Sequence, residues 1–136
     1  MALRPTLQIF AGIAAGLLLS AAGNSDQVAA QDLATALRIA PQNYYLVDVR
    51  TAAEFRAKQG RVEGTRNLPY PGLMWRLDEL EPTEGQVVVL ICRSAHRSRL
   101  ALPGVRKKLS SFSVVELEGG MQSWWDAGLP LVREQP

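Results

Sequence analysis

Cysteine and histidine are almost absent from this chain of 136 residues, which contains one of each, Cys92 and His96. A single cysteine excludes an internal disulfide framework and a cysteine-based zinc site. A single histidine excludes a metal site built from several imidazoles, and any serine triad would have to use that same His96. The sequence also lacks the G-x-S-x-G turn that exposes a serine nucleophile in α/β hydrolases. Cys92 is therefore the first candidate for a nucleophile.

The chain also carries little net charge, +2 at neutral pH, and is too short for more than one domain. So small an excess of basic residues gives no reason to expect a nucleic-acid partner. With 47% hydrophobic and 21% charged residues, the composition is that of an ordinary globular protein. We expect one globular domain that is a monomer.

The first 22 residues have the pattern of a secretory signal peptide. One basic residue, Arg4, precedes an uninterrupted small and apolar run over residues 9–22. This run is too short for a comfortable membrane span, which needs about 20 apolar residues. It is apolar on every face, unlike an ordinary buried helix. We expect a leader at residues 1–22 and export to the bacterial periplasm; the alternative is a protein anchored by an uncleaved leader.

Two cleavage sites fit the rule that small residues flank the cut, one after Ala22 and one after Ala30. Cleavage after Ala30 would remove Val28, a candidate for a first edge strand, so Ala22 is favoured. The folded domain is then expected over residues 27–133. A free cysteine is unusual in an oxidising compartment, so an exported Cys92 would be either sheltered or kept for chemistry.

Short strands alternate with short helices along the rest of the chain. Stretches rich in β-formers predict strands at 44–50, 65–68, 86–91 and 114–117. Apolar spacing predicts helices at 31–40, 73–80, 97–109 and 121–127, and Pro103-Gly104 predicts a kink or late start in the third. Thr51 and Glu54 have the spacing of a capping box for one more helix. The alternation predicts an α/β fold, with a small parallel five-stranded sheet and helices on both faces.

Cys92 lies where a predicted buried strand ends and a basic loop begins. The residues with basic side chains that follow it are Arg93, His96, Arg97 and Arg99. Two structural explanations compete with a functional one: free cysteines are often core residues, and charge clusters are usually solvated faces. The position favours a site, because ligands of open α/β sheets bind at the carboxyl ends of strands. Cations and the start of the next helix would stabilise a thiolate, a persulfide or a bound oxyanion there.

Four blocks of the sequence, spread over about residues 28–132, resemble the rhodanese family of sulfurtransferases. The blocks are Leu46-Val47-Asp48-Val49-Arg50 with Glu54-Phe55; Gly60 to Pro69; Cys92-Arg93-Ser94-Ala95-His96-Arg97-Ser98; and Leu117-Glu118-Gly119-Gly120-Met121 with Trp124. The third block is similar to the family's active loop, C-R-x-G-x-R-S. Two positions depart from the family's pattern. Ala95 replaces a glycine, which would strain the loop if positive φ is needed there, and Arg61 replaces a histidine.

The resemblance implies that Cys92 takes the outer sulfur of thiosulfate or a similar donor and becomes a persulfide. The terminal sulfur then passes to cyanide or a thiol, and no cofactor or metal takes part. Arg93 and Arg97 would bind the donor's sulfonate, although Arg97 is equally suited to holding the loop in place. The expected partners are thus a small sulfur-containing anion as donor and a thiol or cyanide as acceptor. No nucleic acid is expected, and a membrane only if the leader is uncleaved.

The resemblance also assigns the neighbouring side chains. Ser94 and Ala95 belong to the loop, and His96 would either meet the substrate or simply be exposed. Ser98 is expected to cap the following helix rather than to react. Asp48 and Arg50 resemble family positions that form an internal ion-pair network, here in a supporting role behind the loop. Trp124 and Trp125 are expected in the core and at the rim of the last helix.

Two other functions stay open. Phosphatases with a similar thiol loop place five residues between cysteine and arginine. Here four separate Cys92 from Arg97, a tighter ring that suits sulfur better than phosphate or arsenate. The other alternative is a non-enzymatic persulfide carrier or binding module for an exported partner protein. Its docking surface would be formed by the basic residues Arg61, Arg66, Arg99, Arg106, Lys107 and Lys108, unless these are a solvated face.

Overall fold

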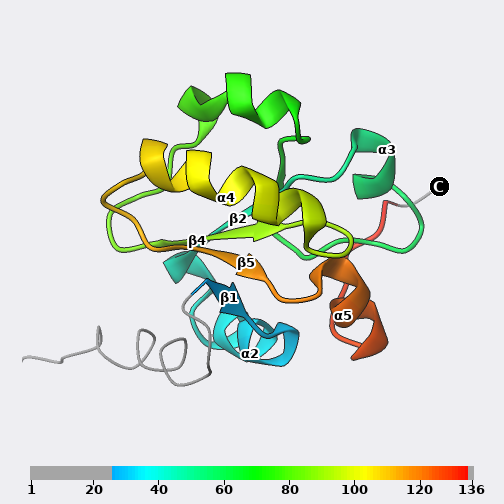
Figure 1. The fold of residues 1–136 in the computed structure, drawn as a ribbon. Helices are drawn as coiled ribbons and strands as arrows, with labels where there is room; N and C mark the ends of the chain where they lie inside the picture. Colours follow the sequence, from blue (N-terminus) through cyan, green and yellow to red (C-terminus); the bar gives the residue numbers. More distant parts are fainter. Residues whose placement is uncertain (1–25, 135–136) are drawn as a thin grey trace, which may run out of the picture.

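The computed structural model describes residues 26–134, which form an α/β domain around a five-stranded parallel sheet. The strand order is β1-β5-β4-β2-β3 (Figure 1). The strands are β1 (Gln27–Val28), β2 (Tyr44–Asp48), β3 (Arg66–Asn67), β4 (Val87–Ile91) and β5 (Val114–Leu117). All pairs of neighbouring strands are parallel, which confirms the predicted fold class.

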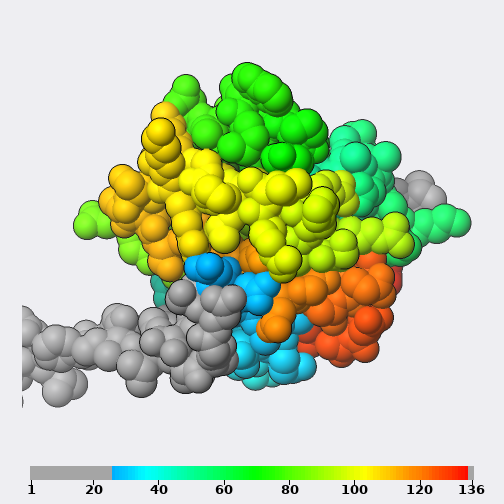
Figure 2. Space-filling view, in the orientation of Figure 1, coloured from blue at the N-terminus to red at the C-terminus, as the bar shows by residue number. Residues whose placement is uncertain are grey.

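Helices cover both faces of the sheet. The α-helices are α2 (Ala30–Ile39), α3 (Ala52–Phe55), α4 (His96–Lys108) and α5 (Gly120–Asp126). Three short 3-10 helices join them: η1 (Pro41–Asn43), η2 (Gly72–Trp75) and η3 (Leu77–Glu79). Figure 2 shows α4 running across one side of the molecule, between the η2–η3 segment and the N-terminal segment. The two layers of helix bury most residues of β2, β4 and β5, as an all-parallel sheet requires, whereas β3 at the edge stays partly exposed.

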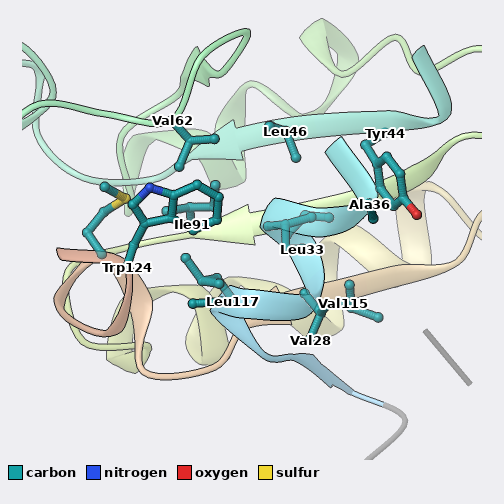
Figure 3. Packing of buried hydrophobic residues seen from close by; sticks show 13 residues of the cluster. Val28, Leu33, Ala36, Tyr44, Leu46, Val62, Ile91, Val115, Leu117 and Trp124 are labelled. Atoms are coloured by element: carbon teal, nitrogen blue, oxygen red, sulfur yellow. The ribbon is translucent and has the colours of Figure 1, made fainter. Parts of the chain in front are cut away.

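The hydrophobic core consists of two clusters, one on each face of the sheet. One lies under α2 and α5, where Leu33 and Trp124 pack on alternate residues of β4 and β5 (Figure 3). The other lies under α4 and η2 and includes Leu90 and Cys92. Every residue of the central strand β4 except its first is fully buried. The strand that precedes Cys92 therefore lies in the interior of the domain.

Two predicted helices differ from those observed. Residues 72–79 form two 3-10 helices rather than one α-helix, because the backbone leaves the helical conformation at Arg76, whose φ is −124°. The second difference is in α4, which runs without interruption from His96 to Lys108 and contains Pro103. A Cβ atom at Gly104 would meet the terminal methyl group of Met74 in η2, which is the flexible end of a side chain and can move aside. Because α4 packs on the sheet and on η2, the Pro-Gly pair does not end the helix.

The predicted edge strand at Val28 is present, since β1 pairs with β5 through Gln27–Glu116 and Val28–Leu117. The predicted leader at residues 1–22 lies outside the described residues, and its cleavage stays a prediction. Within residues 26–134, none of the helices has the length and apolar character needed to cross a membrane.

Candidate active site

Cys92 directly follows β4, at the edge of the sheet where the parallel strands have their carboxyl ends. Its side chain is buried, and its Sγ lies 3.5 Å from Oγ of Ser98 in the first turn of α4. The loop between Cys92 and α4 contains three residues, Arg93, Ser94 and Ala95. A thirteen-residue helix thus begins immediately beyond the thiol, and the positive end of its dipole favours an anion on the sulfur.

Ala95 adopts the left-handed conformation, with φ 68°, and is the N-cap residue of α4. It is the only residue other than glycine with positive φ among residues 26–134. The strain predicted from the loop sequence is therefore present. A left-handed alanine brings its Cβ close to the following carbonyl oxygen, at a cost of about 1–2 kcal/mol. The buried Cβ is held in place by the surrounding loop.

Replacement of Ala95 by glycine is expected to stabilise the domain by about 1 kcal/mol, because the steric cost disappears and only part of it is offset by the greater freedom of glycine in the unfolded chain. The measurement is the free energy of unfolding in urea. Ala127→Gly is the matched control, since Ala127 is exposed and has an ordinary φ of −82°. Equal or lower stability of Ala95→Gly relative to Ala127→Gly would show that the loop is relaxed.

The N-terminus of α5 supports the loop from the opposite side to α4. The backbone N–H of Met121 donates to the carbonyl of Cys92 at 2.7 Å, and that of Gln122 to the carbonyl of Arg93 at 3.0 Å. Gly120, with φ 61°, lies against the same two peptide groups. The backbone of the loop is thus fixed between two helix N-termini, α4 ahead of it and α5 behind it (Figure 1).

Arg97 forms a two-pronged ion pair with Glu54 of α3. Its Nη1 lies 2.7 Å from Oε1 and its Nη2 lies 2.8 Å from Oε2. The hydrogen bond to Glu54 is the main cause that raises the pKa of Arg97, and the charge of Cys92 contributes in the same direction. Glu54 also completes the predicted capping box with Thr51, which is confirmed. Arg97 therefore anchors the loop to α3, one of the two roles weighed for it, and its binding of a sulfonate stays a prediction.

The Glu54–Arg97 pair makes the stability of the domain depend on pH. The hydrogen bond from Arg97 lowers the pKa of Glu54 from its usual 4.5 to about 2. A carboxyl whose pKa is depressed on folding stabilises the native state above its unfolded pKa and loses that contribution as the pH falls through the folded value. Glu54→Gln is therefore expected to cost about 1 kcal/mol at neutral pH, and the difference from wild type should vanish between about pH 4.5 and 2.

Urea unfolding of both proteins across this pH range measures the difference. Glu63→Gln, which removes an exposed carboxylate near the same part of the chain, is the control and should show no such trend. A Glu54→Gln effect of constant size down to about pH 2 would contradict the depressed pKa of Glu54.

Asp48 and Arg50 form a buried ion pair behind the loop, as the resemblance implied. Arg50 Nη2 lies 2.7 Å from Asp48 Oδ2, and both side chains are 1% exposed. Asp48 also accepts from the backbone N–H of Arg50, so the pair fixes the turn after β2. The guanidinium carbon of Arg50 lies 5.7 Å from the centre of the Trp125 ring. Trp124 is buried and Trp125 half-buried, in agreement with the predicted core and rim positions.

The other predicted loop residues lie at different depths. Arg93, Ser94 and His96 are exposed around the buried thiol, so a small anion could meet them from solvent. Ser98 does not cap α4, because the cap position is Ala95, three residues earlier. Its hydroxyl instead faces the carbonyl of Ala95 at 3.1 Å and Oε2 of Glu116 at 2.9 Å. The helix-capping prediction for Ser98 is therefore wrong.

Sequence reasoning missed Glu116 and the pairing partner of Arg97. Glu116 sits in the middle of β5, where an acidic residue would ordinarily alternate to a solvated face, yet only 2% of it is exposed. Its acidic character inside an apolar strand was the one available signal. Of the basic residues considered for docking, Arg106 is engaged with Asp26 at 2.8 Å and Lys108 pairs with Asp78.

A model of the Rhodanese-like domain matches residues 29–127 of the chain. The chain belongs to the rhodanese-like family. The match covers strands β2 to β5 and the loop after Cys92, and it begins one residue after β1. At the level of the family it supports sulfurtransferase-type activity.

Individual relatives agree with the rhodanese-like assignment. The chain is 36% identical over 88 residues to an uncharacterized protein of Synechocystis sp., a match that covers 65% of the chain and 46% of that protein. The chain thus spans about half the length of this relative. A rhodanese-related protein from Thermoplasma volcanium has a similar structure, with a TM-score of 0.66 at 28% identity over 80% of this chain and 99% of that one. The rhodanese-like domain of an Anabaena sp. protein shares the fold, with a TM-score of 0.66 at 22% identity over 79% of each chain.

Proposed function

We propose that this rhodanese-like protein is a sulfurtransferase that moves sulfane sulfur from thiosulfate or a similar donor to cyanide or a thiol. The observation that carries the proposal is the position of Cys92. The only thiol of the chain follows the central strand and faces the N-terminal turn of α4, and its charge interacts with that of Arg97, the second residue of the same helix. Each of these neighbours favours negative charge on sulfur, which both the thiolate and the persulfide carry.

The reaction has two half-reactions. In the first, the Cys92 thiolate attacks the outer sulfur of thiosulfate, the donor's S–S bond breaks, and sulfite leaves with the electron pair. In the second, cyanide or a thiolate attacks the terminal sulfur of the persulfide, and Cys92 returns to the thiolate. The exposed Arg93 is suited to receive the sulfonate, whereas Arg97 is already bound to Glu54 and acts mainly through its charge.

Intact-mass spectrometry of the full chain tests this function. The reduced protein is incubated with thiosulfate, and its mass is expected to rise by one sulfur, about 32 Da, on Cys92. Addition of cyanide should restore the original mass and release thiocyanate. No adduct on reduced, folded protein would refute the sulfurtransferase and favour a binding module instead.

We also propose that the protein acts after export to the bacterial periplasm. The proposal is supported by the signal-peptide pattern of residues 1–22. N-terminal sequencing of the protein from the periplasmic fraction is expected to begin at Gly23. An intact Met1 in the membrane fraction would indicate the anchored alternative.

A further inference from the structure

A buried carboxylate, Glu116, lies on the same face of the sheet as the thiol. It pairs in register with Leu90 of the neighbouring strand, and Cys92 lies two residues beyond Leu90. Side chains two residues apart point to the same face of a parallel sheet, so Glu116 and Cys92 both face α4. Ser98, in the first turn of α4, bridges them: its Oγ lies 2.9 Å from Oε2 of Glu116 and 3.5 Å from Sγ of Cys92.

The other contacts of Glu116 compensate its charge only partly. Its Oε1 accepts from Nε2 of Gln27 at 2.9 Å and lies 3.5 Å from Nε of Arg99, whose side chain is 66% exposed. The attraction between Glu116 and a largely solvated cation is weak, so it offsets little of the free energy that burial of a carboxylate costs. Within residues 26–134, the hydrogen bond that the structure provides to Oε2 comes from Ser98. A purely structural ion pair does not explain why this oxygen is directed at a residue that touches the nucleophile.

The hydroxyl of Ser98 has one proton and three acceptors within reach: Oε2 of Glu116, the carbonyl of Ala95, and Sγ of Cys92. An ionised Glu116 is the strongest of these acceptors and takes the proton. The lone pairs of Ser98 then face the sulfur, which favours a protonated thiol. When Glu116 is protonated, it donates to Ser98 instead, and the Ser98 hydroxyl is free to donate to a thiolate. The protonation states of Cys92 and Glu116 are therefore opposed.

We propose that Cys92 and Glu116 share one proton through Ser98. The thiol ionises by passing its proton to Ser98 while Ser98 passes its own to Glu116, so that S–H and COO⁻ become S⁻ and COOH with no change in net charge. The nucleophile is thus generated without releasing a proton to solvent. Glu116 touches neither substrate nor reacting sulfur and is a positioning residue for the nucleophile. The use of the shared proton in catalysis rests on the proposed function. The shared proton itself does not, because ionisation of Cys92 requires no sulfur donor.

Other charged groups lie on the elements next to the pair. Those on the loop and α4 are Arg93, His96, Arg97 and Arg99; those on neighbouring elements are Asp48, Arg50, and the Asp26–Arg106 pair beside β1. A substitution at Glu116 leaves all of them in the protein but removes the ion pair with Arg99. These groups influence the pH of each ionisation step, whereas the number of steps depends on the shared proton.

The test is a pH titration of the ultraviolet absorbance of the thiolate, with Cys92→Ser as the blank. Because the chain has one cysteine, the whole signal comes from Cys92. Two groups that share a proton titrate in two macroscopic steps. Wild type is therefore expected to gain thiolate in two steps separated by a plateau, and Glu116→Gln in one step. Glu116→Leu, an apolar replacement that commonly preserves stability, should give the same single step if the glutamine variant does not fold.

Glu118→Gln is the matched control, because it removes the same charge two residues further along but from an exposed side chain. It is expected to retain both steps. A single step in wild type, coincident curves for wild type and Glu116→Gln, or loss of a step in Glu118→Gln would each overturn the shared proton. These outcomes are independent of the persulfide experiment, so a protein inactive with thiosulfate can still titrate in two steps, and an active one in a single step.

Discussion

Cys92→Ser is expected to abolish sulfur transfer, with thiocyanate formation falling to the rate of the protein-free reaction. The serine hydroxyl is not ionised near neutral pH and forms no persulfide, so both half-reactions stop. The fold should survive, because Ser98 and its hydrogen-bonded neighbours offer a polar partner to the new hydroxyl. We expect the free energy of unfolding to change by no more than about 1 kcal/mol.

Thiocyanate production and intact mass after thiosulfate treatment are measured on the same variant. An independent control is wild type whose thiol has been blocked by alkylation, which modifies Cys92 alone. Both proteins should lack the persulfide adduct. Turnover retained by folded Cys92→Ser would refute the assignment of the nucleophile.

Gly120→Ala is expected to destabilise the domain by about 3 kcal/mol or more and to abolish sulfur transfer. A Cβ atom at this position would overlap the carbonyl oxygen of Cys92 and come within 2.6 Å of the carbonyl carbon and oxygen of Arg93. These are backbone atoms held by hydrogen bonds from α5, so they cannot move aside without distorting the loop. The overlap costs about 1–3 kcal/mol, and the left-handed conformation at φ 61° adds about 1–2 kcal/mol.

Gly128→Ala separates the two contributions. Gly128 has a nearly identical φ of 64°, but no atom lies within 4 Å of the position where its Cβ would be. This variant should lose only the conformational cost and keep its activity. Urea unfolding of the two variants measures the difference, and equal destabilisation would show that the close approach of Gly120 to the loop is relaxed in solution.

Much of the architecture follows from local patterns in the sequence. The strands and the capping box at Thr51 and Glu54 depend on neighbouring residues, and both were predicted and are observed. The positive φ of Ala95, on which the strain expected from the resemblance depended, is also observed. A late start of α4, one of the two effects expected of Pro103-Gly104, is not observed, since the helix begins at His96. In the folded domain, α4 packs on the sheet and on η2, and tertiary packing preserves the helix around a missing N–H.

The parts that escaped prediction are contacts between residues far apart in the chain. Arg97 meets Glu54 across 43 positions, and Ser98 meets Glu116 across 18. No periodicity or spacing rule connects such pairs, since they come together only when β5 and α3 take their places beside the loop. A motif can therefore suggest a candidate nucleophile, whereas its partners from distant parts of the chain are found only from the three-dimensional fold.

The hydrogen bonds from α5 to the loop have a consequence for the newly made chain. The carbonyls of Cys92 and Arg93 find their partners in Met121 and Gln122, which are synthesised only after α4 and β5. A ribosome-bound chain that has exposed the cysteine but not α5 lacks these two hydrogen bonds to the loop. If Cys92 acts as proposed, the loop that holds it is completed only in one of the last steps of folding.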